Sequence, residues 1–398
     1  MNIKELTYCI QSANINFLIG SGASRPFLST LGSIEIWLTY LYEKMRSSSD
    51  SKYTIVEASI YKAFYRNVIA PNSFDKVDDN PNYSLTKKNY QTFFAIWNDL
   101  LSKRHSRILN KQVNVFTTNV DLMIEDSTCG MGIELNDGFR GSVKSVYDEA
   151  NFMKSIMQTS LHFQHTSEIP VFNLLKVHGS INWKEDNGQI INNSDWYQRI
   201  ENALGKIDEN CFIDIIEKIP DGEEQEKSID KMLSEAEKLN IVDPAIYNDF
   251  IHEYQKLIII NPTKRKFAET VLDYHFYELM RIYSNALEKE NSVLFVAGFS
   301  FADEHIATLT RRSAENNPTL KVIIFAYCDE EVKSFKQNLG IGTTCKNNNI
   351  TIISPSILIN ANKDDEYKEL IDKIKFFDRC TVNEVFSYLN KKIYASYE

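Results

Sequence analysis

The stretch Ile15-Asn16-Phe17-Leu18-Ile19-Gly20-Ser21-Gly22-Ala23-Ser24 joins an apolar run to a turn that holds two glycines within three residues. The chain of 398 residues contains only 14 glycines, about half of what average usage would give. A backbone requirement therefore explains the turn better than composition does. The pattern predicts a buried strand that leads toward a helix, with exposed N–H groups that can hold a phosphate. A tight turn without a ligand is the alternative. Arg25 stands where a GxGxxG fingerprint has its third glycine, so the interpretation as a dehydrogenase loses its main support.

Similar apolar runs, rich in Ile, Val and Phe, recur along the chain. Continuous apolarity is typical of strands that are buried on both faces of a parallel sheet. The runs are 15–19, 113–116, 172–177, 256–260, 293–297, 320–326 and 350–353. The helical segments between them are 31–45, 89–108, 266–289 and 303–315. This alternation predicts an α/β fold with a doubly wound, Rossmann-like parallel sheet. Such sheets bind ligands at the carboxyl ends of their strands.

Three segments depart from this alternation. Residues 47–85 mix serines, Asn, Asp and two prolines, which predicts an irregular excursion around a short helical piece. Residues 183–253 are polar and helix-prone, and their acidic stretch 221–240 is typical of a solvated helix face. Beyond 359, apolar residues at helical spacing predict two packing helices, with contact to a partner as the alternative. The expected organisation is an α/β domain of 1–182 and 254–358, a helical insert at 183–253 and a C-terminal helical extension at 359–398.

Composition and charge exclude several classes of protein. A hydrophobic fraction of 43% and a charged fraction of 25% belong to a folded chain, long enough for about two to three domains. The net charge of −10 argues against a broad nucleic-acid-binding surface. No apolar stretch is long enough to cross a membrane and no signal region begins the chain, which predicts a cytoplasmic protein. The six cysteines form no CxxC pair, so we expect buried, reduced thiols.

Polar residues follow three more of the predicted strands. Thr117-Thr118-Asn119-Val120-Asp121 places an amide and a carboxylate where both can face a sugar, with an Asx turn or helix cap as the alternative. His178-Gly179-Ser180 offers a histidine that can polarise a ribose hydroxyl or a water, although a lone histidine is more often structural. Residues 298–303 offer a close backbone approach at Gly298, the Ser300 hydroxyl and a helix cap at Asp303. Each signal is weak when it is taken alone.

Taken in order, the four motifs resemble the signature elements of the sirtuins. Sirtuins carry Gly-Ala-Gly-x-Ser, Thr-Gln-Asn-x-Asp, a catalytic His-Gly and a Gly-Thr-Ser turn, each after a strand of one NAD-binding sheet. The resemblance spans about residues 14–356. Asn136-Asp137-Gly138-Phe139 and Asn261-Pro262-Thr263 also resemble stretches of bacterial sirtuin-like proteins. Four matches in the same order are far more specific than any one of them.

The resemblance implies NAD as the substrate and a role for each motif. Asn119, Asp121 and His178 would be the catalytic residues: the first two would hold the nicotinamide ribose and amide region, and His178 would be the catalytic histidine. The other matched positions would line the NAD, and they are Gly20, Ser21, Gly22, Ala23 and Ser24 at the pyrophosphate, Thr118 next to Asn119, and Gly298 and Ser300 at the adenosine.

Two departures from the sirtuin pattern shape the expected function. Protein-deacylating sirtuins carry a four-cysteine zinc module after His-Gly, but only Cys211 lies between His178 and Gly298, so we expect no zinc. Thr118 replaces the usual Gln. Both departures weaken the case for acyl-peptide binding and leave an NAD-cleaving core. The chain is therefore most similar to the zinc-less sirtuin-like effectors of prokaryotic antiphage defence, in particular the type encoded beside a HerA-type ATPase.

This resemblance implies an NAD+ glycohydrolase that depletes NAD+ during infection. It also implies a homo-oligomer, with a HerA-type ATPase or helicase as its partner and without direct nucleic-acid binding. The alternatives are an NAD-dependent protein deacylase or ADP-ribosyltransferase, and a non-enzymatic sensor of NAD or ADP-ribose.

Overall fold

A seven-stranded sheet in the order β13-β12-β11-β1-β2-β8-β3 forms the centre of the protein, and all its neighbouring strands pair in parallel. The computed structural model describes residues 1–30, 34–45, 50–73, 79–104, 109–162, 165–215, 225–239, 241, 243–260, 274–342 and 346–394. The strands are β1 (Asn14–Ile19), β2 (Gln112–Thr117), β3 (Glu134–Asn136), β8 (Val171–Lys176), β11 (Ser292–Ala297), β12 (Lys321–Phe325) and β13 (Ile350–Ile353). Without the edge strand β3, this is the order of a Rossmann-like sheet. The predicted α/β fold with a doubly wound parallel sheet is confirmed.

One predicted strand, 256–260, is not a strand of this sheet. The pairing described for it is an isolated antiparallel bridge between Gly179 and Ile259. Ile259 packs with helices beside the sheet, whereas Ile260 packs on the sheet itself. The apolarity of this segment therefore reflects burial between two cores. Conversely, β3 was not predicted, because Glu134-Leu135-Asn136 is short and mostly polar.

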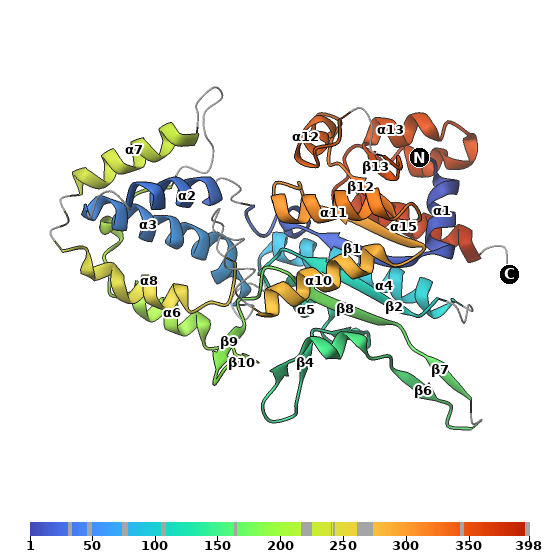
Figure 1. The fold of residues 1–398 in the computed structure, drawn as a ribbon, viewed down its shortest axis with the longest axis horizontal. Coiled ribbons are helices and arrows are strands. Elements are labelled where there is room, and N and C mark those ends of the chain that lie inside the picture. The colour runs from blue at the N-terminus through green and yellow to red at the C-terminus, as the bar shows by residue number, and fades with distance from the viewer. Residues whose placement is uncertain are drawn as a thin grey trace.

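Helices cover both faces of the sheet (Figure 1). On one face α1 (Ile3–Ser12), α4 (Pro81–Ser102) and α15 (Arg379–Tyr394) pack against side chains such as Phe17. On the other face α10 (Tyr274–Glu288) and α11 (Glu304–Asn316) pack against side chains such as Leu18. Successive side chains of a strand point to opposite faces, so one apolar run supplies both cores. The shorter helices around the sheet are α5 (Met123–Thr128), α12 (Glu331–Asn338), α13 (Pro355–Ala361) and α14 (Lys368–Ile371).

Four asparagines, Asn16, Asn114, Asn173 and Asn136, form a hydrogen-bonded row across β1, β2, β8 and β3 that we call the asparagine ladder. The side-chain amide of Asn136 donates to Asn173 Oδ1 at 2.9 Å, that of Asn173 to Asn114 Oδ1 at 3.1 Å, and that of Asn114 to Asn16 Oδ1 at 2.9 Å. Neighbours in the ladder are also register partners in the sheet. A slip of one residue would break these bonds and exchange the two faces of a strand. The ladder therefore helps to fix the register.

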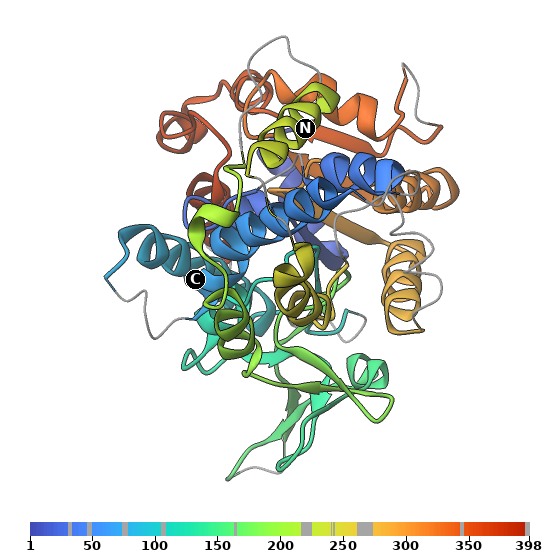
Figure 2. The same cartoon turned by 90° about the vertical axis from the view of Figure 1, so that its left-hand side faces the viewer.

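A second hydrophobic core, which we call the helical group, lies against loops at the carboxyl edge of the sheet. It consists of α2 (Ile34–Met45), α3 (Ser51–Phe64), α6 (Trp196–Leu204), α7 (Gln225–Lys238) and α8 (Asn248–Gln255), which lie in front of the sheet in Figure 2. Val120 and Ile181, from loops after β2 and β8, belong to the same hydrophobic cluster. In its described residues, 50–73 and 79–85, the excursion predicted at 47–85 is mostly helical and not irregular. The consecutive residues Ile55–Tyr61 of α3 are all buried, and α3 packs with helices of the predicted insert at 183–253.

Two small antiparallel sheets complete the fold. One consists of β4 (Phe139–Arg140), β5 (Val146–Tyr147), β10 (Gln189–Asn192) and β9 (Trp183–Asp186), and the other of β6 (Met157–Thr159) and β7 (Thr166–Glu168). The segment from Trp183 therefore begins with a hairpin before its helices. The β6–β7 hairpin projects away from the body of the protein (Figure 1).

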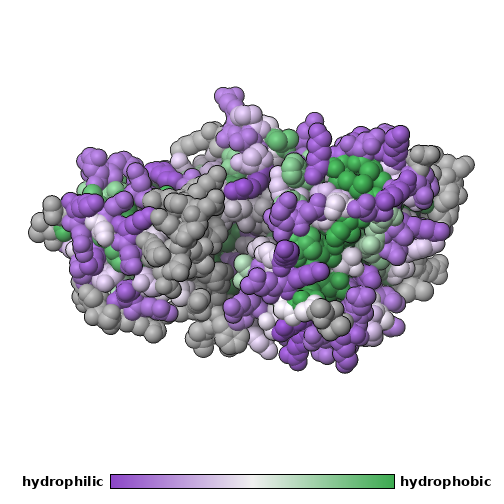
Figure 3. Space-filling view, turned by 90° about the horizontal axis from the view of Figure 1, so that it is seen from above, coloured by the Kyte–Doolittle hydropathy of each residue, from purple (hydrophilic) through white to green (hydrophobic). Residues whose placement is uncertain are grey.

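The tail packs on the protein's own core. The ring centroid of Phe386 on α15 lies 6.3 Å from that of Phe17 and 5.3 Å from that of Phe295. The outer surface seen in Figure 3 is largely hydrophilic, with apolar residues gathered on the lobe that contains the sheet. In the part of the chain that the structure describes, no helix has the length and apolarity needed to cross a membrane.

The prediction of buried cysteines is wrong for the five that the structure describes. Cys129 and Cys380 are exposed, and Cys9, Cys211 and Cys328 are partly exposed. Cys129 directly follows the last residue of α5, and Cys380 lies in the first turn of α15. Ends of helices reach the surface more often than their centres do, which the spacing of cysteines along the chain does not reveal.

Candidate functional site

The turn after β1 and the turn after β11 lie side by side where the strand order reverses. In doubly wound sheets this switch point is where ligands bind. Gly22 N donates to Gly298 O at 2.9 Å, and Gly20 N donates to Ala297 O at 3.1 Å. A Cβ atom on Gly20 or Gly298 would overlap with backbone atoms of the opposite turn. Gly20 and Gly298 are thus required for the contact between the two turns. The residues that remain exposed at these turns are Ser21, Gly22, Gly298 and Ser300.

Ser24 lies beneath the first turn, and its hydroxyl joins three side chains. Asn119 Nδ2 donates to Ser24 Oγ at 3.2 Å, and Ser24 Oγ donates to Asp121 Oδ2 at 3.2 Å. The Tyr90 hydroxyl on α4 lies 3.1 Å from the same oxygen. Since a serine has one hydrogen to give, Tyr90 is the donor in that pair. Ser24 is buried and its hydroxyl is fully used by these bonds, so its side chain holds Asn119 and Asp121 in place. The neighbouring Ala23 is also buried.

The loop after β2 holds Asn119 and Asp121 by short-range hydrogen bonds. Thr117 Oγ1 accepts from Asn119 N at 3.0 Å, and Asp121 Oδ1 accepts from Met123 N at 3.0 Å. The Asx-type turn considered as an alternative is therefore present, together with the contacts to Ser24. Burial raises the pKa of Asp121 above its ordinary value, and Lys176 partly offsets this. Thr118 is partly exposed.

One buried atom of this loop has no partner. Among the residues that the structure describes, nothing forms a hydrogen bond with Asn119 Oδ1, and Asn119 is 5% exposed. Most buried polar atoms in proteins are paired, so a buried acceptor of this kind requires an explanation. A donor group of a ligand, or a water, would supply the missing bond.

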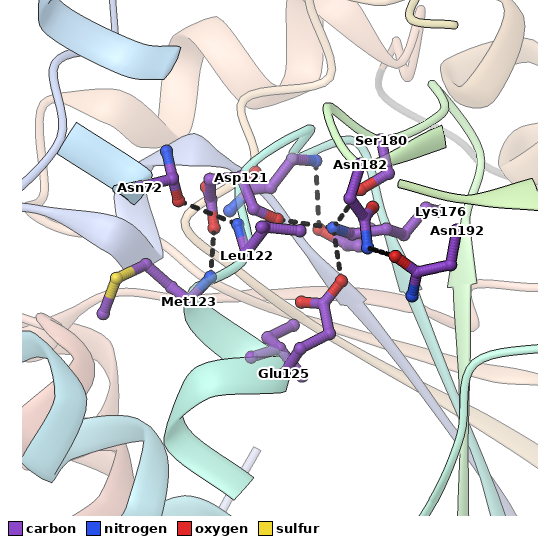
Figure 4. Close-up of polar contacts among 12 residues, drawn as sticks. Asn72, Asp121, Leu122, Met123, Glu125, Lys176, Ser180, Asn182 and Asn192 are labelled. Atoms are coloured by element: carbon purple, nitrogen blue, oxygen red, sulfur yellow. Dashed lines mark hydrogen bonds and ion pairs between the residues drawn. The ribbon is translucent and has the colours of Figure 1, made fainter. Parts of the chain in front are cut away.

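Lys176, at the end of β8, connects the loops after β2 and β8 (Figure 4). Its ammonium donates to the Asp121 carbonyl at 2.5 Å and to Ser180 Oγ at 2.8 Å. It also lies 2.7 Å from Glu125 Oε1, and Lys176 is 3% exposed. Sequence reasoning missed this residue. The signal was a lysine inside an apolar run, because a lysine is rarely buried without specific partners.

His178 contacts Asp303 on the other side of the switch point. His178 Nε2 lies 3.0 Å from Asp303 Oδ2, and both side chains are largely buried. Asp303 also caps α11, as predicted: its Oδ1 accepts from His305 N at 3.0 Å and from Ile306 N at 3.2 Å. The sequence predicted the cap but not the contact with the histidine.

The four motifs form a closed ring of contacts. Ser24 bonds to Asn119 and Asp121, and the Val120 carbonyl accepts from Ile181 N at 3.1 Å. His178 contacts Asp303, and Gly298 O accepts from Gly22 N. The structure thus brings together the loops that carry all the predicted site residues. Asn261-Pro262-Thr263 lies outside the described residues, and Asn136 of the other sirtuin-like stretch belongs to the asparagine ladder.

Nothing in the described residues gathers three or more His, Cys, Asp or Glu side chains in a way that could hold a metal ion. The absence of zinc remains a prediction. Two cavities of about 370 Å³ in the described part of the chain lie elsewhere. One is lined by the start of α3 and the end of α7, and the other by α1, Lys321, Asn348 and Thr351.

The fold and the ring define a Rossmann-like α/β protein with a candidate ligand site at its switch point. Residues 252–353 match the model of the SIR2-like domain, which supports a sirtuin-like family for this chain. The match contains the fourth motif, and the first three motifs lie before it. SIR2-like domains act on NAD+, so the match also associates the chain with NAD-related activity. No curated protein matches the chain.

Proposed function

We propose that this protein is an NAD+ glycohydrolase. In the proposed reaction, NAD+ and water give nicotinamide, ADP-ribose and a proton. The bond between C1′ and the nicotinamide nitrogen breaks, and its electron pair leaves with nicotinamide, while water supplies the new oxygen on C1′. The protein has to hold the ribose, admit one water and exclude other acceptors.

The observation that carries the proposal is the closed ring of four loops at the switch point. Four motifs far apart in the sequence contribute to one edge, and each is joined to the next by a hydrogen bond or a polar contact. A ring of this kind is expected where one extended ligand touches several strand ends. Three of the links join loops after neighbouring strands, and the contact between His178 and Asp303 joins the loops after β8 and β11, which are not neighbours in the sheet.

The charges at the ring suit this reaction. The nicotinamide ring of NAD+ is cationic, and positive charge moves to the ribose as the bond breaks. Asn119 Oδ1 presents a buried acceptor that has no partner among the described residues. Asp121 lies on the same loop, and Asp303 lies on the loop after β11. Fixed acceptors aimed at developing positive charge stabilise a transition state because they need no reorganisation.

Each motif then has one task. Asn119 positions the ribose or the water, with Asp121 beside it. His178 accepts a proton from the water or a ribose hydroxyl. The backbone of the turn from Gly20 to Ser24 holds the pyrophosphate, Thr118 lines the NAD next to Asn119, and Gly298 and Ser300 lie at the adenosine. No zinc takes part.

The biological setting is proposed from the resemblance to antiphage effectors. The protein would deplete NAD+ in infected cells as a homo-oligomer, with a HerA-type ATPase or helicase as its partner. In cells challenged with phage, NAD+ should fall with the wild-type chain and stay constant with Asn119→Ala.

The direct test is chromatography of NAD+ incubated with the purified chain, alone and together with the proposed HerA-type ATPase partner. We expect nicotinamide and ADP-ribose in equal amounts. Asn119→Ala and His178→Ala should each lower the rate at least about 100-fold, the scale of a lost general base or positioning group. His252→Ala, an exposed histidine on α8, is the matched control and should keep the rate.

Three results would contradict the hydrolase. Product that forms only with an acylated peptide, as O-acyl-ADP-ribose, would indicate a deacylase. ADP-ribose transferred to protein would indicate a transferase. Saturable binding of NAD+ without nicotinamide release, in the presence of the ATPase as well, would indicate a sensor.

A further inference from the structure

We infer that Asp303 is a positioning residue that fixes the orientation and the tautomer of His178. The inference deepens the proposed function, on which its catalytic part rests. It begins from the contact between His178 Nε2 and Asp303 Oδ2 at 3.0 Å, in which the two side chains are 13% and 9% exposed. A carboxylate is an acceptor, so the ring nitrogen that faces it carries the hydrogen.

The carboxylate itself is held in place by the start of α11. Its second oxygen accepts from the backbone N–H groups of His305 and Ile306. The amino end of a helix favours negative charge, so this position suits a carboxylate and keeps it aligned. One side chain therefore both caps a helix of 13 residues and faces the histidine.

The histidine is held from the other side by the segment 258–260. Ile260 N donates to the His178 carbonyl at 2.9 Å, and Ser180 N donates to the Ile258 carbonyl at 3.1 Å. At Gly179, φ is +78° and a Cβ atom would overlap with the Ile258 carbonyl. The backbone around His178 thus has little freedom, which fixes the position from which the ring reaches Asp303.

This arrangement determines which nitrogen can accept a proton. With the hydrogen on Nε2 facing Asp303, the lone pair of the neutral ring is on Nδ1. When Nδ1 takes a proton from the water or the ribose hydroxyl, Asp303 stabilises the imidazolium that forms. A carboxylate that orients a catalytic histidine has this effect in serine proteases.

Asp303→Asn separates this role from helix capping. Asparagine is as good a helix cap as aspartate, so its Oδ1 can keep the bonds to His305 and Ile306. Its NH2 group then faces His178 Nε2 and donates to it, which moves the ring hydrogen to Nδ1. The variant should fold normally and hold the histidine in the wrong tautomer.

The test combines nitrogen NMR of the full chain, labelled with 15N-histidine, with NAD+ cleavage kinetics. His178→Gln identifies the His178 signals. The wild type should show neutral His178 with the hydrogen on Nε2, and Asp303→Asn should show it on Nδ1. We expect the same variant to lower kcat at least about 100-fold, by analogy with the orienting aspartate, with KM changed less than threefold. Asp303→Ser, which keeps a capping oxygen, should also lose kcat.

Asp50→Asn, at the cap of α3, is the matched control and should change neither readout. An unchanged His178 tautomer in Asp303→Asn would overturn the inference, and so would wild-type kcat in that variant. If the wild type cleaves no NAD+, the proposed function fails, but the tautomer measurement still decides whether Asp303 positions His178.

Discussion

Two of the buried polar networks in the described part of the chain differ in one respect. In the asparagine ladder every side-chain amide finds a partner, and its ends bond to the backbone at Val293 and Asn151. In the second, which we call the edge network and which consists of Ser24, Asn119, Asp121, Lys176 and Ser180, the acceptor Asn119 Oδ1 has none among the described residues. The first network lies within the sheet, and the second at its carboxyl edge.

This difference distinguishes buried polar residues that stabilise the fold from buried polar residues that are available to a ligand. A closed network stabilises one register and has no capacity left for a ligand. An open one keeps a buried acceptor that folding alone does not satisfy, at a cost of about 1–3 kcal/mol. We therefore expect changes in the ladder to affect stability, and changes at the open atom to affect activity.

The largest effect is expected for Lys176→Met, which removes the cation that joins the two loops of the edge network. Glu125 Oε1 then loses its partner in a largely buried site. Breaking a buried ion pair costs about 3–5 kcal/mol, and equilibrium unfolding in urea measures it. Lys103→Met, in a pair with Asp99 that is nearly half exposed, is the control and should cost less than about 0.5 kcal/mol. A decrease of less than about 1 kcal/mol in the free energy of unfolding of Lys176→Met would show that Lys176 does not hold the edge network together.

The contrast between the networks is tested most directly by Asn114→Ala and Asn119→Ala. Asn114→Ala leaves Asn16 Oδ1 without its donor and Asn173 Nδ2 without its acceptor. We expect it to lower the free energy of unfolding by about 2 kcal/mol and to leave NAD+ cleavage per folded molecule unchanged.

Asn119→Ala should do the reverse. It removes one side-chain hydrogen bond, to Ser24, and an unsatisfied oxygen, so stability should change by less than about 1 kcal/mol while cleavage is lost. Equal losses of stability in both variants, or equal losses of activity, would show that the two networks do not differ in function.

The smallest effect concerns the pH dependence of stability at Asp121. Burial raises the pKa of this carboxyl in the folded state, whereas the unfolded chain has the ordinary value of about 3.9. As pH rises above about 4, the unfolded chain releases this proton first, so stability falls until Asp121 also ionises in the folded state. Asp121→Asn removes this contribution. As pH rises over this range, the free energy of unfolding of Asp121→Asn should increase relative to that of the wild type. A difference between the two that does not depend on pH would contradict the raised pKa of Asp121.

Much of the sheet was predictable because each core strand is a continuous apolar run. The run 15–19 became β1, and 293–297 became most of β11. The strand predicted at 256–260 was wrong because apolar residues indicate burial but not pairing with another strand. Ile259 is buried by helices and not by strands. The helical group was missed as a unit because its two halves, around α3 and α6, are more than a hundred residues apart. No local pattern reveals that they share a core.

The candidate site divides in the same way. Sequence reasoning selected Ser24, Asn119 and His178, since polar residues after buried strands stand out against an apolar background. It did not find Tyr90, Lys176 or the second contact of Asp303, because a helix residue, a strand residue and a helix cap each have an adequate local explanation. Their partners lie on other elements of the fold.

The sequence by itself determined the alternation of strands and helices and the four turns, because periodicity and turn chemistry are local properties of the chain. The tertiary structure decided which turns meet, which glycines are needed for contacts between turns, and that Asn119 Oδ1 is among the buried polar atoms left open in the described residues. Those are relations between atoms that only the strand order brings within hydrogen-bonding distance. Gly20 and Gly298 illustrate both parts. Their positions after apolar runs were visible in the sequence, and the fold showed that each lacks a side chain because the backbone of the opposite turn lies against it.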